Sequence, residues 1–251
     1  MLEDTFSDNL RQTAVISKYE LKKYLRGRKI VIFAILMGAW LILNIALPYL
    51  VSDGLGTDPN VMAGSFLSIM LFFVVLLAML FVSGTIVSEF EERTALMLFT
   101  KPLRKWSVFM GKIITAFAVG FVFILIYYAI TAAVSLVVMG AVSSSMAVSL
   151  GLAVTYLFGT AGVAVLISSL VNKSSTAAIL TFVTLLMIMT VISGILGAYS
   201  VDPWFMLDTS GGNITGCFAG GIDAWRGAGV ALVWGLVTGA LGYLIFRRRE
   251  L

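Results

Sequence analysis

The chain has 251 residues, of which 60% are hydrophobic and 12% charged, and its mean hydropathy is +1.03. A soluble globular domain is far less apolar, so the composition predicts an all-α integral membrane protein. One cysteine, Cys217, excludes a disulfide framework or a cysteine-based metal site within one chain. The absence of histidine removes the commonest metal ligand and the commonest general base, which argues against most enzymatic functions.

Residues 1–29 are basic and contain no apolar h-region in the first twenty positions, so they do not form a cleavable signal peptide. Leu10, Ala14, Leu21 and Leu25 fall roughly on one helical face. This spacing predicts an amphipathic helix that lies along the inner membrane surface. The alternative is a solvated basic tail.

Five uncharged runs are long enough to cross a hydrocarbon core of roughly 30 Å. The run 113–172 holds no charge at all, and as one helix it would be about 90 Å long. It therefore predicts two spans, with a break at residues 140–145. The six predicted spans are about 30–50, 61–88, 113–139, 147–171, 174–199 and 227–246. Together with the segments that connect and flank them, they form a single transmembrane domain over residues 1–251.

The distribution of Lys and Arg predicts the orientation. If the N-terminus is inside, inner segments hold sixteen of the seventeen basic residues, and only Arg226 lies outside. We therefore expect a multi-pass protein of the plasma membrane with both termini cytoplasmic. The outer segment 200–226 carries aromatic residues such as Trp204 and Trp225, which suit the membrane interface. It predicts either a re-entrant helix or a surface loop.

Small residues recur at a spacing of four in two of the predicted spans, a pattern that allows helices to approach closely. They are Gly194 and Ala198 in the fifth span, and Ala231, Gly235 and Gly239 in the sixth. Such stripes predict helix contacts, either within one chain or between two copies.

None of the six spans contains Asp, Glu, Lys or Arg, which argues against an ion-coupled carrier, a proton pump or a voltage sensor. The main polar residues within the spans are Asn44, Tyr127, Tyr128, Thr131, Ser135 and Thr155. They either line a path for a mostly apolar substrate or are satisfied by hydrogen bonds within the protein. We expect no metal site, because the twelve methionines are ordinary core filler and only Met187 and Met189 lie close together in a span.

The charged stretch 84–112 reads GTIVSEFEERTALMLFTKPLRKWSVFMGK. It has acids first, then an apolar patch at 96–99, then Pro102 and a basic cluster. An apolar centre with a charged rim is typical of a docking surface. The alternative is that the patch lies on the inner leaflet. Gly111 and Lys112 lack the other residues of a P-loop, so ATP, if it drives this protein, binds to another chain.

This stretch resembles the signature region of the type-2 ABC-exporter permease family. Glu89, Glu91 and Glu92 match the acidic end of the second span, and residues 94–99 match the Thr-led coupling helix. Pro102 with Arg104 matches the turn, and Gly111 with Lys112 matches the Gly-Lys that opens the third span. Arg93 stands where a glycine often precedes the threonine. Six spans, inner termini and a long outer segment before the last span agree with the resemblance.

The resemblance implies a half-transporter that is not itself an enzyme. It implies no cofactor on this chain, with ATP and Mg on a partner ATPase, and a complex of two ATPase subunits with two copies of the permease, most simply a homodimer. Membrane lipid is an expected partner and nucleic acid is not. The ATPase-docking residues would be Glu89, Glu91, Glu92, Arg93, Thr94, Leu96, Leu98, Phe99, Pro102 and Arg104.

Because the spans carry no charge, we expect export of a hydrophobic or amphipathic compound. One alternative is a motor-driven subunit that passes mechanical work to an external partner, similar to the membrane subunit for copper-enzyme maturation. A partner that grips residues 200–226 would favour it. The other alternative is a channel or scaffold without nucleotide dependence.

Overall fold

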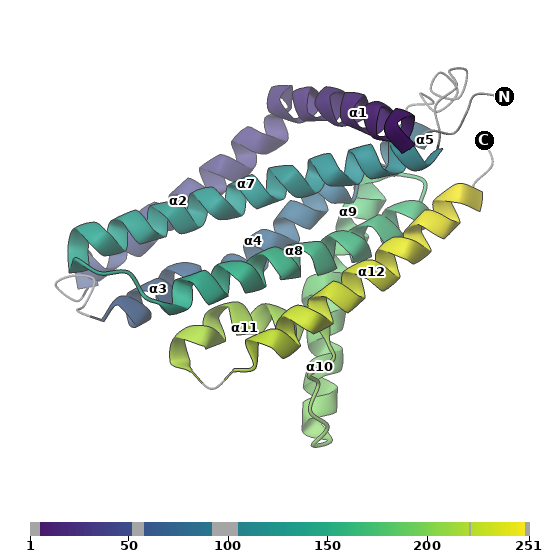
Figure 1. Ribbon diagram of the computed structural model, residues 1–251. Helices are drawn as coiled ribbons and strands as arrows, with labels where there is room; N and C mark the ends of the chain where they lie inside the picture. The colour runs from purple at the N-terminus through teal and green to yellow at the C-terminus, as the bar shows by residue number, and fades with distance from the viewer. Residues whose placement is uncertain (1–5, 52–57, 92–104, 221, 249–251) are drawn as a thin grey trace.

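The computed structural model describes residues 6–51, 58–91, 105–220 and 222–248, and these contain helices and no strand (Figure 1). The helices are α1 (Phe6–Arg26), α2 (Arg28–Val51), α3 (Pro59–Leu67), α4 (Met70–Leu77), η1 (Ala78–Val82), α5 (Val87–Glu91), α7 (Lys105–Met139), α8 (Ser145–Leu170), α9 (Ser174–Val183), η2 (Thr184–Ile188), α10 (Met189–Ala198), α11 (Leu207–Ala219) and α12 (Ala224–Arg248). The labels η1 and η2 denote π-helical turns. The predicted all-α class is thus confirmed.

Within the described residues, six helices are candidates for membrane spans by length and composition, the number predicted. The helices that are long and apolar enough to cross a membrane cover Arg28–Leu50, Pro59–Val82, Trp106–Met139, Ser145–Leu170, Ser174–Ala198 and Ala224–Arg248. The second is built from α3, α4 and η1, and the fifth from α9, η2 and α10.

The third spanning helix differs most from its predicted bounds. α7 begins at Lys105, eight residues before the predicted span, so residues 105–112 are helical rather than part of a loop. With 35 residues it is about 52 Å long, well beyond a hydrocarbon core of roughly 30 Å. It ends at Met139, the next residue Gly140 has a φ of 70° that favours glycine, and α8 follows after a short turn.

The helix α1 lies beside the first turns of α7 (Figure 1). It contacts the bundle through a face that includes Ile16, Ser17 and Glu20. The predicted apolar face lies elsewhere, and its four residues, Leu10, Ala14, Leu21 and Leu25, are all exposed. Its position at a membrane surface stays a prediction.

The helix α8 lies at the centre of the bundle, where it packs on α7, α11 and α12. Its closest partner is α12, because glycines on both helices leave no space between the backbones. A Cβ atom on Gly162 would lie 2.6 Å from the Gly235 carbonyl oxygen, and one on Gly159 would lie 2.9 Å from the Ala231 carbonyl oxygen. The predicted small-residue contact therefore forms within the chain at Ala231 and Gly235.

The other small residues of the predicted stripes make no such contact. A Cβ atom on Gly239 or on Gly194 would meet nothing within 4 Å, and Ala198 is exposed. The close approach continues instead at Gly242, where a Cβ atom would lie 2.9 Å from a methyl group of Val165.

The segment 200–226 contains a packed helix. α11 lies against α3, α8 and α12, and buries Leu207, Ser210 and Ile214. The Ser210 hydroxyl donates to the Gly227 carbonyl oxygen at 2.7 Å, and the Ser149 hydroxyl donates to that of Ile214 at 2.7 Å. The part of this segment in α11 is therefore packed into the bundle, whereas its insertion into the outer leaflet stays a prediction.

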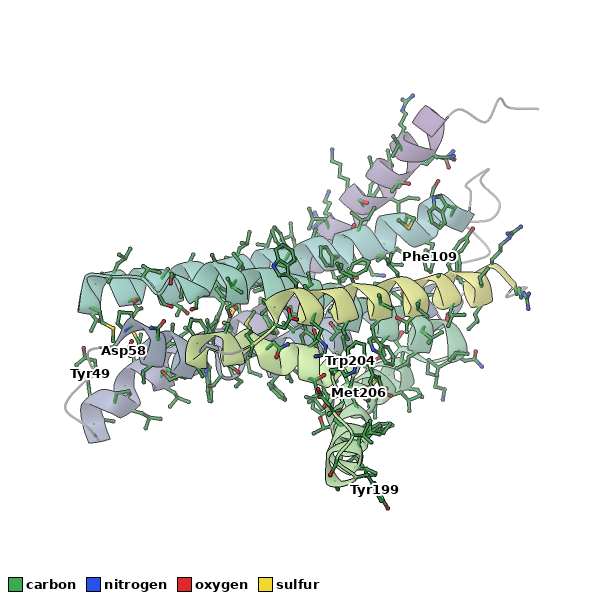
Figure 2. All side chains as sticks on the ribbon, turned by 60° about the horizontal axis from the view of Figure 1, so that its bottom comes forward. Tyr49, Asp58, Phe109, Tyr199, Trp204 and Met206 are labelled. Carbon is green, nitrogen blue, oxygen red and sulfur yellow. The ribbon has the colours of Figure 1, made fainter. Side chains whose placement is uncertain are left out.

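Two spanning helices are left largely open. α10 projects from the rest of the bundle and ends near Tyr199, which is 79% exposed (Figure 2). α2 also exposes many large apolar side chains along its length. These surfaces can face lipid or a second copy of the chain.

Candidate functional site

The candidate site is described through the end of α5 and the start of α7, which lie at the end of the bundle where α1 begins and α12 ends (Figure 1). The predicted docking residues Glu92, Arg93, Thr94, Leu96, Leu98, Phe99, Pro102 and Arg104 lie outside the described residues, and of Glu89 only the helical backbone is described. The geometry of the site is therefore given by the helices that flank this segment, α5 before it and α7 after it.

On the α5 side, Glu91 connects the segment to the fifth span. Its Oε2 atom accepts a hydrogen bond of 2.8 Å from the backbone N–H of Ser174, the first residue of α9. A carboxylate at a helix N-terminus satisfies a free N–H and interacts favourably with the helix dipole. Hydrogen bonds from Ser174, followed by the charge of Lys173, lower the pKa of Glu91 below its ordinary value of 4.5. Of the ten predicted docking residues, Glu91 is thus one whose contact the structure describes.

The Glu91 contact is expected to depend on pH. Since the pKa of Glu91 is lower in the folded chain, the contact stabilises the fold at pH values above the unfolded pKa and is lost as pH falls through the folded pKa. Hydrogen exchange of the Ser174 amide, corrected for its intrinsic pH dependence, should show protection at pH 7 that disappears on acidification. Glu91→Gln should weaken the protection at pH 7 and remove the pH dependence.

The Ala177 amide, which donates to the Lys173 carbonyl oxygen at 3.0 Å, serves as the control and should not respond to Glu91→Gln. Equal protection of Ser174 in the wild type and the variant would contradict the assigned contact.

The second span ends in an irregular turn, and side chains from α1 and the start of α2 donate hydrogen bonds to its backbone. In η1 the Ser83 N–H reaches back five residues to the Ala78 carbonyl oxygen at 2.9 Å. Such a π turn disturbs the regular helical bonding pattern and often occurs at functional sites. The Tyr24 hydroxyl donates to the Phe81 carbonyl oxygen at 2.8 Å, and Lys29 Nζ donates to that of Leu80 at 3.0 Å. The turn before α5 is therefore held by side chains from the N-terminal part of the chain.

On the α7 side, a buried ion pair joins the same N-terminal helix to the third span. Lys112 Nζ lies 2.7 Å from Glu20 Oε1, and the two side chains are only 4% and 14% exposed. Next to the pair the helices touch closely, because a Cβ atom on Gly111 would lie 2.9 Å from a methyl group of Ile16. The Ser17 hydroxyl also donates to the Gly111 carbonyl oxygen at 3.0 Å. The Gly-Lys pair thus forms the surface on which α1 packs.

Glu20 and Tyr24 were missed by the sequence analysis, which used α1 only as a basic, membrane-facing helix. A signal was present, because Glu20 is the one acidic residue between positions 9 and 29. It lies four residues from Ile16 and from Tyr24, on the face opposite most of the lysines. Its partner Lys112 could not be identified from the sequence, because nothing local connects positions that are 92 residues apart.

Comparison with known proteins gives the family. A family model described as ABC-2 family transporter protein matches residues 28–208. The match covers most of the chain. The protein belongs to the ABC-2 transporter family. It is therefore a membrane permease subunit, it is not an enzyme, and its family implies a partner ATPase subunit. No curated protein matches the chain.

The matched residues of this ABC-2 permease run from the start of α2 to the start of α11. They include the described flanks of the candidate site, α5 and the first turns of α7. The helices α1 and α12 lie outside the match, so their packing against α7 and α8 is an observation from the structure alone.

The polar residues predicted for a substrate path have partners within the permease. The hydroxyl groups of Tyr127, Thr131 and Thr155 donate to backbone carbonyl oxygens. The hydroxyl oxygens of Tyr128 and Ser149 lie 2.7 Å apart, and Asn44 Nδ2 donates to the Trp40 carbonyl oxygen at 3.1 Å. Ser135 donates to the Ala141 carbonyl oxygen at 2.6 Å. These bonds favour a structural role, and the substrate path stays a prediction.

Proposed function

We propose that this ABC-2 permease exports a hydrophobic or amphipathic compound, driven by a separate ATPase that docks on residues 88–112 at the cytoplasmic side. The uncharged spans support the substrate class, because they offer no buried charge to an ion or a strongly polar solute. The docking segment itself is supported by its composition, with an apolar patch at 96–99 between acidic and basic clusters.

The observation that carries the proposal is how the described helices on either side of residues 92–104 are joined to the rest of the bundle. Before these residues, the second span is joined to α9 through Glu91 and to α1 through Tyr24. After them, α7 is joined to α1 through Lys112 and Glu20. A displacement of the docked segment would therefore be passed to spans two, three and five together. Rigid helices with few alternative packings are the elements through which such movements are transmitted.

The proposal includes a second copy of the chain as partner, so that two permeases meet two ATPases. The open apolar faces of α2 and α10 support an assembly of this kind, since they expose side chains such as Ile35, Ile42 and Val191. ATP-dependent approach of the two ATPases would move the docked segments, and the spans would exchange inward- and outward-open states.

The test is co-purification with an ATPase subunit encoded beside the permease. The wild-type permease should form a stable complex in detergent with two copies of each chain. Phe99→Asp should abolish the complex, because it places a charge in the apolar patch, whereas Phe99→Leu should preserve it. A complex that Phe99→Asp leaves unchanged would refute docking through this patch, and no association at all would favour the channel or scaffold.

A further inference from the structure

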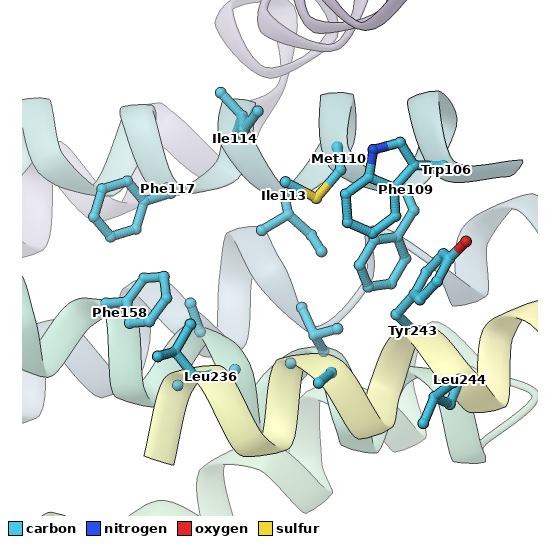
Figure 3. A pocket seen from close by; sticks show the side chains of 16 residues that line it. Trp106, Phe109, Met110, Ile113, Ile114, Phe117, Phe158, Leu236, Tyr243 and Leu244 are labelled. Carbon is cyan, nitrogen blue, oxygen red and sulfur yellow. The ribbon is translucent and has the colours of Figure 1, made fainter. Parts of the chain in front are cut away.

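An apolar groove with a volume of about 560 Å³ opens between α7 and α12, with α8 as its floor (Figure 3). Trp106 and Tyr243 lie at one end, with their ring centroids 4.8 Å apart. Phe117 and Phe158 lie at the other end, with centroids 6.2 Å apart. Gly239 leaves open space between them, since a Cβ atom there would meet nothing within 4 Å. Its lining includes Trp106, Phe109 and Met110 from the proposed docking segment 88–112, and its other residues lie outside that segment.

The length and position of the groove match one leaflet of a bilayer. On α12 it extends from Gly235 to Leu244, which is about 14 Å at 1.5 Å per residue. This is about half of a hydrocarbon core of roughly 30 Å. The end of the groove at Trp106 and Tyr243 is the one nearer the chain termini. Trp and Tyr rings are enriched at the membrane interface. The groove therefore covers the depth of the leaflet on that side.

Positive charge stands directly beyond the end of the groove at Trp106 and Tyr243. Arg247 and Arg248 follow Tyr243 and Leu244 by four residues each, so they lie on the same faces of α12, one turn closer to the end of the helix. Both arginines are exposed. The groove has the depth of one leaflet and ends next to two arginines. It is therefore complementary to a lipid that has an acyl chain and an acidic headgroup.

We infer that the groove binds an anionic phospholipid from the leaflet on the side of the termini. One acyl chain lies along α8 between α7 and α12, and the phosphate group meets Arg247 and Arg248. The apolar lining accommodates the acyl chain, because transfer of its methylene groups from the bilayer to the groove is close to neutral in free energy. The two arginines provide the preference for an anionic headgroup. Each basic residue near an anionic headgroup favours binding by roughly fivefold.

The test uses the full-length permease in nanodiscs of phosphatidylcholine. These are doped with either phosphatidylglycerol or phosphatidylcholine that carries a photoreactive group on its acyl chain, and mass spectrometry locates the labelled residues. The phosphatidylglycerol probe should label the groove residues of α7 and α12 at least fivefold more than the phosphatidylcholine probe. The double variant Arg247→Gln with Arg248→Gln should bring that ratio close to one.

Gly239→Leu is the second variant, and it extends a side chain from a groove position where a Cβ atom meets nothing within 4 Å. It should lower labelling of the groove at least fivefold. Gly229→Leu is the matched control on the same helix, at an exposed glycine outside the groove with the same free space, and should leave labelling unchanged. Equal labelling by the two probes in the wild type, absence of label from the groove, or full labelling of Gly239→Leu would each overturn the inference.

Discussion

Replacing Glu20 by alanine is expected to destabilise the permease by about 3 kcal/mol. This is the lower end of the cost of removing one partner from a buried ion pair, because Glu20 keeps 14% exposure. The variant removes the Glu20 carboxylate that lies 2.7 Å from Lys112 Nζ at the α1–α7 contact. It should also uncouple α1 from the third span beside the docking segment. Thermal unfolding in detergent measures the first effect, and stimulation of ATP turnover by the permease measures the second.

Two further variants make the Glu20 test specific. Lys22→Ala removes an exposed charge from the same helix and should change stability by less than about 0.5 kcal/mol. The double variant Glu20→Leu with Lys112→Met replaces the ion pair by apolar groups, and should recover much of the stability lost in Glu20→Ala. If Glu20→Ala were as stable as Lys22→Ala, the ion pair would not hold α1 in place.

The second large effect is expected at Gly162. Alanine normally stabilises a helix relative to glycine by roughly 0.5–1 kcal/mol. At Gly162 the added Cβ atom would lie 2.6 Å from a backbone oxygen of α12, so α8 and α12 must separate. We expect Gly162→Ala to lower the free energy of unfolding by about 1–3 kcal/mol, as overpacking does elsewhere. Thermal unfolding of the purified variant measures this loss.

Gly151→Ala provides the matched control on the same helix, since a Cβ atom at Gly151 meets nothing within 4 Å. This variant should be as stable as the wild type or slightly more stable. Opposite signs for the two glycines would support the backbone contact between α8 and α12. A neutral effect at both positions would contradict it.

The spans could be predicted from the sequence because the membrane imposes a simple rule on length and polarity. Each run of uncharged residues contains a spanning helix, and the 60-residue run divides at Gly140. The rule fails at the helix ends, because α7 begins at Lys105, about two turns before the uncharged run. There it is stabilised by packing on α1, which hydropathy does not register.

The helix stripe illustrates a second limit. A spacing of four residues repeated twice rotates by about 80° around a helix, so Gly239 leaves the face that holds Ala231 and Gly235. Gly242, eleven residues after Ala231, returns to within about 20° of that face and packs against α8. The four-residue spacing therefore predicted a close helix contact at Ala231 and Gly235. Its continuation at Gly242 follows only from the helical period of 3.6 residues, not from the repeated spacing of four.

For the candidate site, the sequence predicts only the features that are local to the stretch 84–112. Acidic, apolar and basic groups in order along 84–112 indicate a docking segment, which stays a prediction, whereas the contact of Glu91 with Ser174 of α9 was not predicted. The supports of the segment come from residues far away in the chain, such as Tyr24 and Glu20, whose partners depend on the tertiary fold. Such long-range pairs leave no local pattern in a single sequence.

The most direct test of the account is ATP turnover of the partner ATPase in lipid, measured alone, with the wild-type permease and with Phe99→Asp. We predict that the wild-type permease changes the rate of ATP turnover and that Phe99→Leu behaves like the wild type. With Phe99→Asp, the rate should equal that of the isolated ATPase. If the Phe99→Asp permease changed turnover as the wild type does, residues 88–112 would not be the docking segment.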